Sequence, residues 1–279
     1  MFIFKTMNKD KNKDKNDRVV LITGASGGLG RDLAKKFFAR GYRLVLASRN
    51  MDKLNELKDS LTAGKRSSEI ALAADGIGSE ISLAADGIGS EIALTACDVT
   101  KEEDVLAAFE AAIENFGRVD ILVNNAGIGL KKPFYEIEKD EFEKLMQVNA
   151  TGVFLFTKYA HEFMEKGRII TISSIAGIVG AGGYSAYCAS KHAVNGFLKA
   201  ARHDLKKSEK EISISWVNPY KLKTSFDSGY AHKAPDYLKL DTKHYADYVV
   251  ALAEGKGFLA SCIFTRNLAY RIKKMIVKK

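Results

Sequence analysis

Two residues with complementary chemistry, Tyr187 and Lys191, stand four positions apart in the second half of the 279-residue chain. On a helix, this spacing places both side chains on one face. A lysine cation beside a phenol favours the phenolate and lowers a phenol pKa that is otherwise about 10. Tyr187 can then exchange a proton with a carbonyl or alcohol oxygen. Ser174, thirteen residues earlier, can donate a hydrogen bond to the same oxygen and stabilise the charge that develops on it.

A glycine-rich segment near the start of the chain has the pattern of a phosphate-binding loop. Residues 23–30 read Thr-Gly-Ala-Ser-Gly-Gly-Leu-Gly, and they stand between a short apolar run and a helix-like pattern. Such glycines let the backbone approach a pyrophosphate, and the helix amino-terminus adds free N–H groups and a positive dipole end. A plain strand-to-helix turn would also use glycines, but the position after the first strand favours a dinucleotide-binding loop.

The rest of the chain alternates between strand-like and helix-like segments. Helical patterns include residues 102–115 and 139–165. Strands that alternate with helices indicate right-handed crossovers and a doubly wound parallel sheet, with the ligand at the carboxyl ends of its strands. Since no linker divides it, we expect one α/β domain of the Rossmann type over residues 18–263. The strand-like runs are residues 19–23, 43–48, 120–124, 168–173 and 212–217.

Together these motifs resemble the short-chain dehydrogenase/reductase family, over roughly residues 18–255. The matching motifs are the Gly-x3-Gly-x-Gly loop after Thr23, Asn-Asn-Ala-Gly at 124–127, Asn149, Ser174 and Tyr-x3-Lys. The resemblance implies hydride transfer between a nicotinamide cofactor and a carbonyl or secondary alcohol substrate, with Tyr187 as the general acid/base. It also implies that Lys191 holds the nicotinamide ribose and that Asn149 supports a proton-relay water. The expected catalytic residues are Ser174, Tyr187, Lys191 and Asn149.

The end of the second strand-like run indicates which cofactor binds. An acidic residue there would bind the ribose hydroxyls of NAD, whereas an arginine accommodates the 2′-phosphate of NADP. The chain has Ser48 and Arg49 here and no acidic residue at positions 47–49, so we expect NADP(H) rather than NAD(H). The alternative is that Arg49 only caps an exposed strand end. By the resemblance, the cofactor-binding residues are Gly24, Ser26, Gly28, Leu29, Gly30, Ser48, Arg49, Asp98, Val99, Asn125, Ala126, Gly127, Tyr187, Lys191, Pro219 and Thr224.

One position departs from the family pattern. After the sixth strand the family usually reads Asn-Pro-Gly with a threonine a few residues later, but this chain has Asn-Pro-Tyr at 218–220 and then Thr224. Tyr220 puts a side chain where close approach is usual. It supports an alternative function, a sensor or regulatory protein that binds NADP(H) with weak or no catalysis. The intact set of Ser174, Tyr187 and Lys191 favours the enzyme.

The net charge of +9 lies at the two ends of the chain. Residues 1–18 contribute +3 and residues 264–279 contribute +6, so the body between them is neutral. This distribution argues against nucleic acid as a partner. We expect a disordered basic leader at 1–17 and a basic amphipathic tail at 264–279. The tail either packs on the protein or a neighbouring subunit, or makes weak peripheral contact with an anionic membrane; a membrane-peripheral structural protein is thus a third possible function.

The hydrophobic content and the cysteines limit which classes of protein are possible. The chain is 46% hydrophobic, yet no apolar run approaches the roughly 20 residues that span a bilayer. Cys97, Cys188 and Cys262 show neither disulfide nor metal-ligand spacing, so we expect a reduced, cytoplasmic protein without a metal site. The resemblance adds a small-molecule substrate and a homodimer or homotetramer.

An eleven-residue unit is repeated three times between positions 68 and 100. The third copy, residues 90–100, ends in Cys-Asp-Val-Thr, whereas the aspartate of the earlier copies, Asp75 or Asp86, comes one position earlier. A one-residue shift turns the side chains of a strand to the opposite face, so we expect the third copy to form the third strand, at the sheet edge. Residues 68–89 are then a 22-residue insertion, either an antiparallel flap on that edge or mobile.

Overall fold

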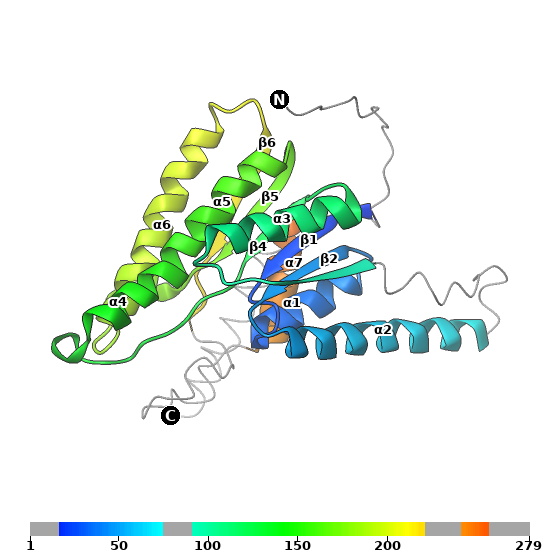
Figure 1. Cartoon of the computed structure of the whole chain (residues 1–279), viewed down its shortest axis with the longest axis horizontal. Coiled ribbons are helices and arrows are strands. Elements are labelled where there is room, and N and C mark those ends of the chain that lie inside the picture. Colours follow the sequence, from blue (N-terminus) through cyan, green and yellow to red (C-terminus); the bar gives the residue numbers. More distant parts are fainter. Residues whose placement is uncertain (1–16, 75–90, 221–240, 257–279) are drawn as a thin grey trace, which may run out of the picture.

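The computed structural model describes residues 17–74, 91–220 and 241–256 (Figure 1). Within them, one parallel sheet has the strand order β3-β2-β1-β4-β5-β6. This order confirms the predicted doubly wound sheet and puts β3 at its edge. The strands are β1 (Val19–Thr23), β2 (Arg43–Ser48), β3 (Ile92–Ala96), β4 (Ile121–Asn124), β5 (Lys166–Ile172) and β6 (Glu211–Val217).

Helices cover both faces of this sheet (Figure 1). One face packs against α1 (Gly28–Phe38), α2 (Met51–Ala74) and α7 (Thr242–Ala253). The other packs against α3 (Glu102–Phe116), α5 (Gly152–Phe163) and α6 (Ser185–Leu205), and α4 (Lys139–Met146) leads into α5. The layers therefore run helix, sheet, helix, as the alternating sequence pattern predicts.

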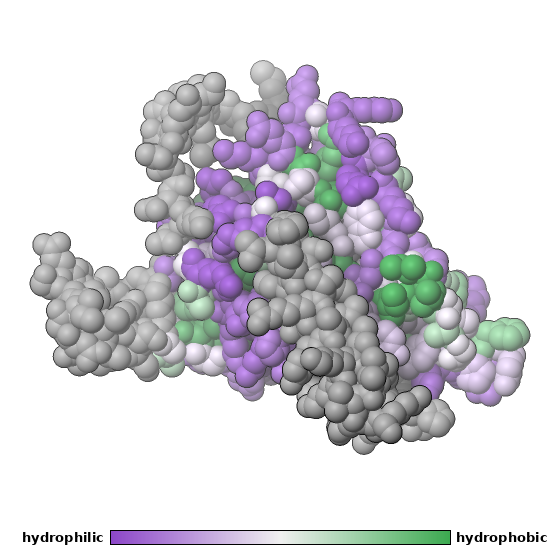
Figure 2. Space-filling view, turned by 180° about the vertical axis from the view of Figure 1, so that it is seen from behind, coloured by the Kyte–Doolittle hydropathy of each residue, from purple (hydrophilic) through white to green (hydrophobic). Residues whose placement is uncertain are grey.

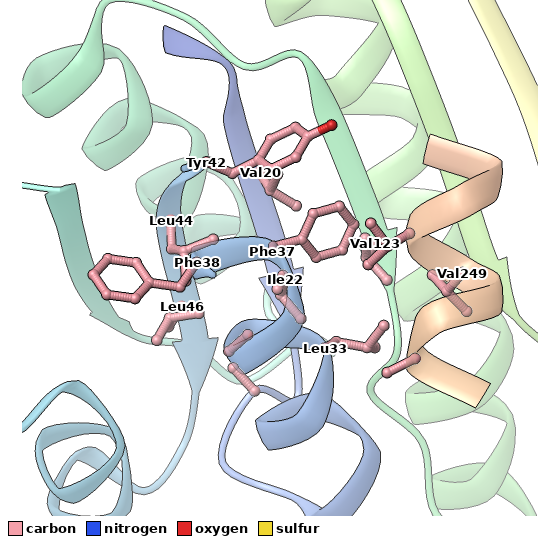
Figure 3. Packing of buried hydrophobic residues seen from close by; sticks show 14 of the residues in the cluster. Val20, Ile22, Leu33, Phe37, Phe38, Tyr42, Leu44, Leu46, Val123 and Val249 are labelled. Carbon is pink, nitrogen blue, oxygen red and sulfur yellow. The ribbon is translucent and has the colours of Figure 1, made fainter. Parts of the chain in front are cut away.

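The central strand shows why the strands are apolar throughout. Successive side chains of a strand point to opposite faces, and β1 sends Val20 and Ile22 into one core and Val19 and Leu21 into the other. All four are completely buried. Figure 3 shows the core beside α1, where the ring of Phe37 packs edge to face against the ring of Tyr42. A strand buried on both sides needs hydrophobic residues at every position.

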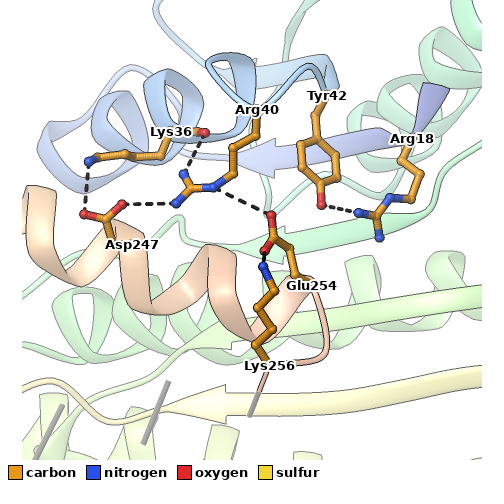
Figure 4. A network of polar contacts seen from close by, with 7 residues as sticks. All are labelled: Arg18, Lys36, Arg40, Tyr42, Asp247, Glu254 and Lys256. Carbon is orange, nitrogen blue, oxygen red and sulfur yellow. Dashed lines mark hydrogen bonds and ion pairs between the residues drawn. The ribbon is translucent and has the colours of Figure 1, made fainter. Parts of the chain in front are cut away.

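Charged residues join α1 to α7 across the outer surface of that core (Figure 4). Asp247 forms ion pairs with Lys36 Nζ at 3.0 Å and Arg40 Nη2 at 3.4 Å, and Glu254 forms one with Arg40 Nε at 3.6 Å. Partly exposed ion pairs of this kind contribute at most about 1 kcal/mol each. The buried residues of α7, such as Val249, supply most of the packing, so the ion pairs mainly fix the register of α7 on α1.

The repeat contributes to one strand and one helix. β3 lies wholly in the third copy, as predicted. α2 continues to Ala74, so the first seven residues of the first copy are helical and do not belong to an antiparallel flap, which corrects that alternative. The reason is local, because the start of the repeat contains good helix formers and neither proline nor glycine. Residues 75–90 lie outside the described residues, as do the basic tail and all of the predicted leader except Asp17.

Candidate active site

A cleft of about 740 Å³ lies at the carboxyl ends of the strands. The chain passes from β1 to β2 and β3 on one side and returns to β4 on the other, so the loops that follow β1 and β4 part at this point. Every predicted site residue lines the cleft except two: Asn149 lies behind its wall, and Thr224 falls outside the described residues.

The glycine loop forms the tight floor that a pyrophosphate requires. Gly24 has a φ of +62°, and a Cβ there would lie 2.9 Å from the Cα of Ala126. A Cβ on Gly30 would lie 2.3 Å from the oxygen of Gly24. The N-cap of α1, Gly27, offers no side-chain cap, so the first N–H groups of the helix are available to an anion. The loop therefore fits a dinucleotide.

Two side chains hold the glycine loop against the end of β4. The hydroxyl of Thr23 accepts hydrogen bonds from the backbone N–H groups of Asn125 and Ala126, both at 3.0 Å. The amide of Asn125 donates to the backbone oxygens of Thr23 at 2.9 Å and Gly24 at 3.1 Å. Thr23 was not among the predicted site residues, although its place directly before the first glycine was the signal for it.

The far end of the cleft has the polar groups expected beside an adenosine. The hydroxyls of Ser26 and Ser48 are 2.6 Å apart, and the neighbouring Arg49 is exposed. Burial opposes the charge of Asp98, but hydrogen bonds from Thr100 and the positive charge of Arg49 outweigh it, so the pKa of that carboxyl is lowered. Arg49 is thus a cation that a ligand at this end can reach.

Lys191 is buried beside Tyr187 on α6. Its ammonium lies 5.9 Å from the centre of the Tyr187 ring and donates to the backbone oxygen of Ile172 at 3.3 Å. Burial lowers the pKa of Lys191 from 10.5 to about 8. The ammonium still carries its charge at neutral pH, where it favours the phenolate form of Tyr187.

Asn149 is completely buried and does not face the cleft. It stands in a π-helical turn, Gln147–Thr151, between α4 and α5. Its Oδ1 accepts from the N–H of Ile128 at 2.8 Å, while its Nδ2 donates to the oxygen of Ile128 at 2.9 Å and to Ser190 Oγ at 3.0 Å. Such turns often mark functional sites. In the geometry described, Asn149 anchors the loop after β4 to α6.

Ser174 and Ser173 bring hydroxyls to the same part of the cleft. Ser174 Oγ accepts from the N–H of Ala176 at 3.2 Å, which leaves its own proton available to a substrate oxygen. Ser173 Oγ is buried and has no hydrogen-bond partner among the described residues. Tyr220 also lines this part and is 58% exposed, so it reshapes the wall of the cleft without filling it.

Other reactive groups near the cleft are inert or structural. Burial raises the pKa of the Cys97 thiol to about 12, so it stays protonated. The ring of His192 binds the backbone oxygen of Cys188 at 2.9 Å. Across the described parts of the chain, no three histidine, cysteine or acidic residues group as metal ligands.

Several lining residues were not predicted from the sequence. Most come from the loops that follow β4 and β5, where the only sequence signal is a place just beyond a strand end; Ile172 ends β5, and Val148 lies in the π-helical turn. They are Ile128, Gly129, Lys131, Val148, Ile172, Ser173, Ile175, Ala176, Val179 and Ala181.

A glycine loop at a helix amino-terminus, facing a tyrosine and a buried lysine across a switch-point cleft, defines a dinucleotide-binding oxidoreductase. The family model described as short chain dehydrogenase matches residues 18–80 and 78–234. The chain therefore belongs to the short-chain dehydrogenase/reductase family and is an NAD(P)-dependent oxidoreductase.

Individual relatives agree with this membership. The chain is 35% identical to (+)-borneol dehydrogenase 2 of Salvia officinalis, over 75% of this chain and 66% of that protein. It is 33% identical to trans-4-hydroxycyclohexanecarboxylate dehydrogenase of Sinomonas cyclohexanicum, over 86% and 87% respectively. A short-chain dehydrogenase/reductase of Burkholderia phymatum, solved with NAD, superposes with a TM-score of 0.70 at 26% identity, over 85% of this chain and 86% of that one.

Among the described residues, no helix is both long enough and apolar enough to cross a bilayer.

Proposed function

We propose that this protein uses NADPH to reduce a carbonyl compound, or NADP⁺ to oxidise the corresponding secondary alcohol, with Tyr187 as the general acid/base. The observation that carries the proposal is that Ser174, Tyr187 and Lys191 line one cleft together with the glycine loop. The nicotinamide cofactor, when bound, supplies or accepts the hydride at the substrate carbon.

The side chains of the chain supply the rest of the reaction. In the direction of reduction, the Tyr187 hydroxyl gives its proton to the carbonyl oxygen that becomes the alcohol. Ser174 donates a hydrogen bond to the same oxygen as negative charge develops there. Lys191, buried and charged at neutral pH, stabilises the tyrosinate that remains. We assign Asn149 the role of holding the loop after β4, through Ile128, beside this site.

The cofactor is held by groups that match its chemistry. The N–H groups at the start of α1 suit the pyrophosphate, and Asp98 and Val99 form the wall beside the adenine. A Cβ on Gly127 would lie 3.2 Å from Asn149 Oδ1 and 3.7 Å from Lys191 Nζ, and we assign Gly127 and Lys191 to the nicotinamide ribose. We extend the proposal to Pro219 and to Thr224 at the nicotinamide, although Thr224 lies outside the described residues.

Incubation of the protein with NADPH and a panel of ketones and aldehydes tests the function. Oxidation of NADPH that depends on the carbonyl compound, followed at 340 nm, is the expected result. The second candidate is an NADP(H)-binding sensor, which Tyr220 favours because its exposed side chain projects at the cleft. Tight binding of NADPH without turnover on any compound would favour the sensor.

Arg49→Asp is expected to weaken NADPH binding by tenfold or more and to affect NADH binding less. One charge-assisted contact to a phosphate is worth roughly 1.5–3 kcal/mol, and the new carboxylate would also face Asp98. Fluorescence titration of both cofactors measures the change. Lys53→Asp is the matched control, because Lys53 is an exposed cation of α2 that does not line the cleft. A parent protein with equal affinity for NADH and NADPH would refute the preference.

Deletion of residues 68–89 is expected to leave the protein folded, with NADPH affinity and turnover within a few-fold of those of the parent. The buried residues of α2 that are described, Leu54, Leu57 and Leu61, all precede the deletion, and β3 follows it. The family match also breaks into two segments at the repeat. A thermal melt and an NADPH titration measure the result.

The control is deletion of the third copy, residues 90–100, which leaves the second copy, residues 79–89, in its place. It removes Asp98 and Val99, and Val99 packs closely on Gly152, where an added Cβ would lie 2.9 Å from its Cγ2. This variant should bind NADPH much more weakly. If the first deletion variant is unfolded, or does not bind NADPH, the repeat is required for folding or for cofactor binding.

We also propose a homodimer or homotetramer. On the outer face of α5 and α6, Phe154 is 45% exposed and stacks edge to face on Phe197 at 5.7 Å. An exposed aromatic pair suits an interface between copies. Light scattering should give a multiple of the chain mass, and Phe154→Glu should shift it toward the monomer. An unchanged mass in that variant would place the interface elsewhere.

The compartment and the tail complete the proposal. A cytoplasmic location is supported by Cys97 and Cys188, which are free and buried. The tail, residues 264–279, lies outside the described residues, and liposome sedimentation would measure any weak membrane contact that it makes.

A further inference from the structure

The loop after β4 brings a lysine to the mouth of the cleft. Lys131 lines the cleft and stands opposite the segment that precedes α6. The N–H of Lys132 donates to the oxygen of Gly183 at 2.8 Å, and a Cβ on Gly183 would meet the Lys131 side chain at 3.7 Å. The same loop is held at its base by the two hydrogen bonds between Ile128 and Asn149. Lys131 is therefore positioned by structure on both sides.

The ammonium of Lys131 lies beside Tyr184, the ring that neighbours the reacting tyrosine. Its Nζ is 5.9 Å from the centre of the Tyr184 ring, and that ring is 6.5 Å from the ring of Tyr187. The neighbouring Lys132 pairs with Glu141 at 2.8 Å, whereas no carboxylate of the described residues forms an ion pair with Lys131. The positive charge is thus available to a ligand that also reaches Tyr187.

The charges along the described wall of the cleft divide it into two ends. Asp98 and Arg49 belong to the adenosine end, and Lys191 is 4% exposed behind Tyr187. At the substrate end, Lys131 is the cation that remains, and no described lining residue there is acidic. Apolar or aromatic side chains also line the cleft: Ile128, Val179, Ala181, Tyr184 and Tyr220.

Hydrophobic side chains also gather on the surface around this end. From behind, green patches lie at the end of the molecule that holds α4 and the start of α6 (Figure 2). Ile178 and Val179, which directly precede the segment opposite Lys131, are 57% and 49% exposed. The entrance is therefore apolar, with one cation inside it among the described residues. Such a surface fits an apolar body that carries one negative charge.

We propose that Lys131 determines specificity by binding the carboxylate of an acidic substrate, a keto acid or hydroxy acid whose reacting carbon lies beside Tyr187. The inference rests on the proposed function, because it places that carbon at Tyr187. The apolar wall holds the carbon skeleton, and Lys131 fixes its far end. A neutral ester of the same acid keeps the skeleton and loses the charge-assisted hydrogen bond.

The experiment compares three acids with their methyl esters as substrates for reduction by NADPH: 4-oxopentanoate, 4-oxocyclohexanecarboxylate and 4-acetylbenzoate. The three lengths sample the span from Tyr187 to Lys131. The parent is expected to prefer at least one acid over its ester in kcat/KM. In Lys131→Gln, the ratio of acid to ester should fall tenfold or more for that pair. Lys132→Gln is the matched control, since its charge is removed one residue away but is already paired with Glu141.

Binding supplies a second readout, independent of turnover. Calorimetry with the NADP⁺ complex and the same acids should show weaker binding to Lys131→Gln than to the parent. An unchanged ratio and unchanged affinity in Lys131→Gln, or a parent that turns over the esters as well as the acids, would overturn the inference while the proposed function stands. Acid binding that depends on Lys131 without any turnover would instead overturn the proposed function and support the site.

Discussion

Tyr187→Phe is expected to lower kcat by about 10²–10⁴-fold, the usual contribution of a general acid or base. The substitution removes the hydroxyl that exchanges the proton and keeps the ring, which packs beside Tyr184 at 6.5 Å between centroids. NADPH affinity should stay within a few-fold, because the glycine loop, Arg49 and the wall at Asp98 are unchanged. Steady-state kinetics on a carbonyl compound that the parent reduces, together with an NADPH titration, measure both quantities.

The control for this substitution is Tyr184→Phe. It removes a phenol from the same cleft, but position 188 is a cysteine and not a lysine, so Tyr184 has no cation four residues further along α6. Its loss of turnover should be far smaller. Near-parental turnover in Tyr187→Phe would show that another group handles the proton.

Lys191→Met is expected to abolish turnover and, at neutral pH, to stabilise the protein without ligand. Burial lowers the pKa of Lys191 from 10.5 to about 8, so the folded state holds this charge at a cost of up to about 3 kcal/mol. Methionine keeps most of the apolar stem and has no charge to desolvate. The gain in the free energy of unfolding is reduced by the loss of the hydrogen bond from Lys191 to the backbone oxygen of Ile172.

The dependence of stability on pH tests the cause of that gain. Below about pH 8, Lys191 is protonated in both states and its full destabilising contribution is present. Between about pH 8 and 10.5, the unfolded chain binds this proton and the folded chain does not, so the contribution of Lys191 to stability rises with pH. Urea unfolding across this pH range should show that the difference in the free energy of unfolding between the parent and Lys191→Met becomes smaller as the pH rises. A constant gap would mean that packing, not charge, separates the two proteins.

Turnover separates the role of Lys191 from that of its neighbours on α6. Lys199→Met, on an exposed part of the same helix, changes the net charge equally and should leave both kcat and the pH dependence of stability close to those of the parent. If Lys191→Met retained kcat, the charge of Lys191 would not be what activates Tyr187.

Much of the fold followed from the sequence because its signals are local. The alternating apolar runs predict the parallel sheet, since a strand buried on both faces has to be apolar at every position. The third repeat copy could be assigned to β3 because a one-residue shift changes which face a side chain occupies. The secondary structure of the first copy was harder to predict, because helix propensity and turn-forming Asp-Gly pairs favour different structures. In the structure, α2 continues to Ala74.

Some features of the candidate site also follow from the sequence, whereas others depend on the tertiary structure. The four-residue spacing of Tyr187 and Lys191 on α6 and the glycines at a helix amino-terminus follow from backbone geometry, which the sequence by itself determines. The burial that lowers the pKa of Lys191 and the π turn that holds Asn149 depend on packing between distant segments. So does the approach of Lys131 to the Tyr184 ring. Only the tertiary structure decides these, because burial and through-space contact depend on which elements the sheet brings together.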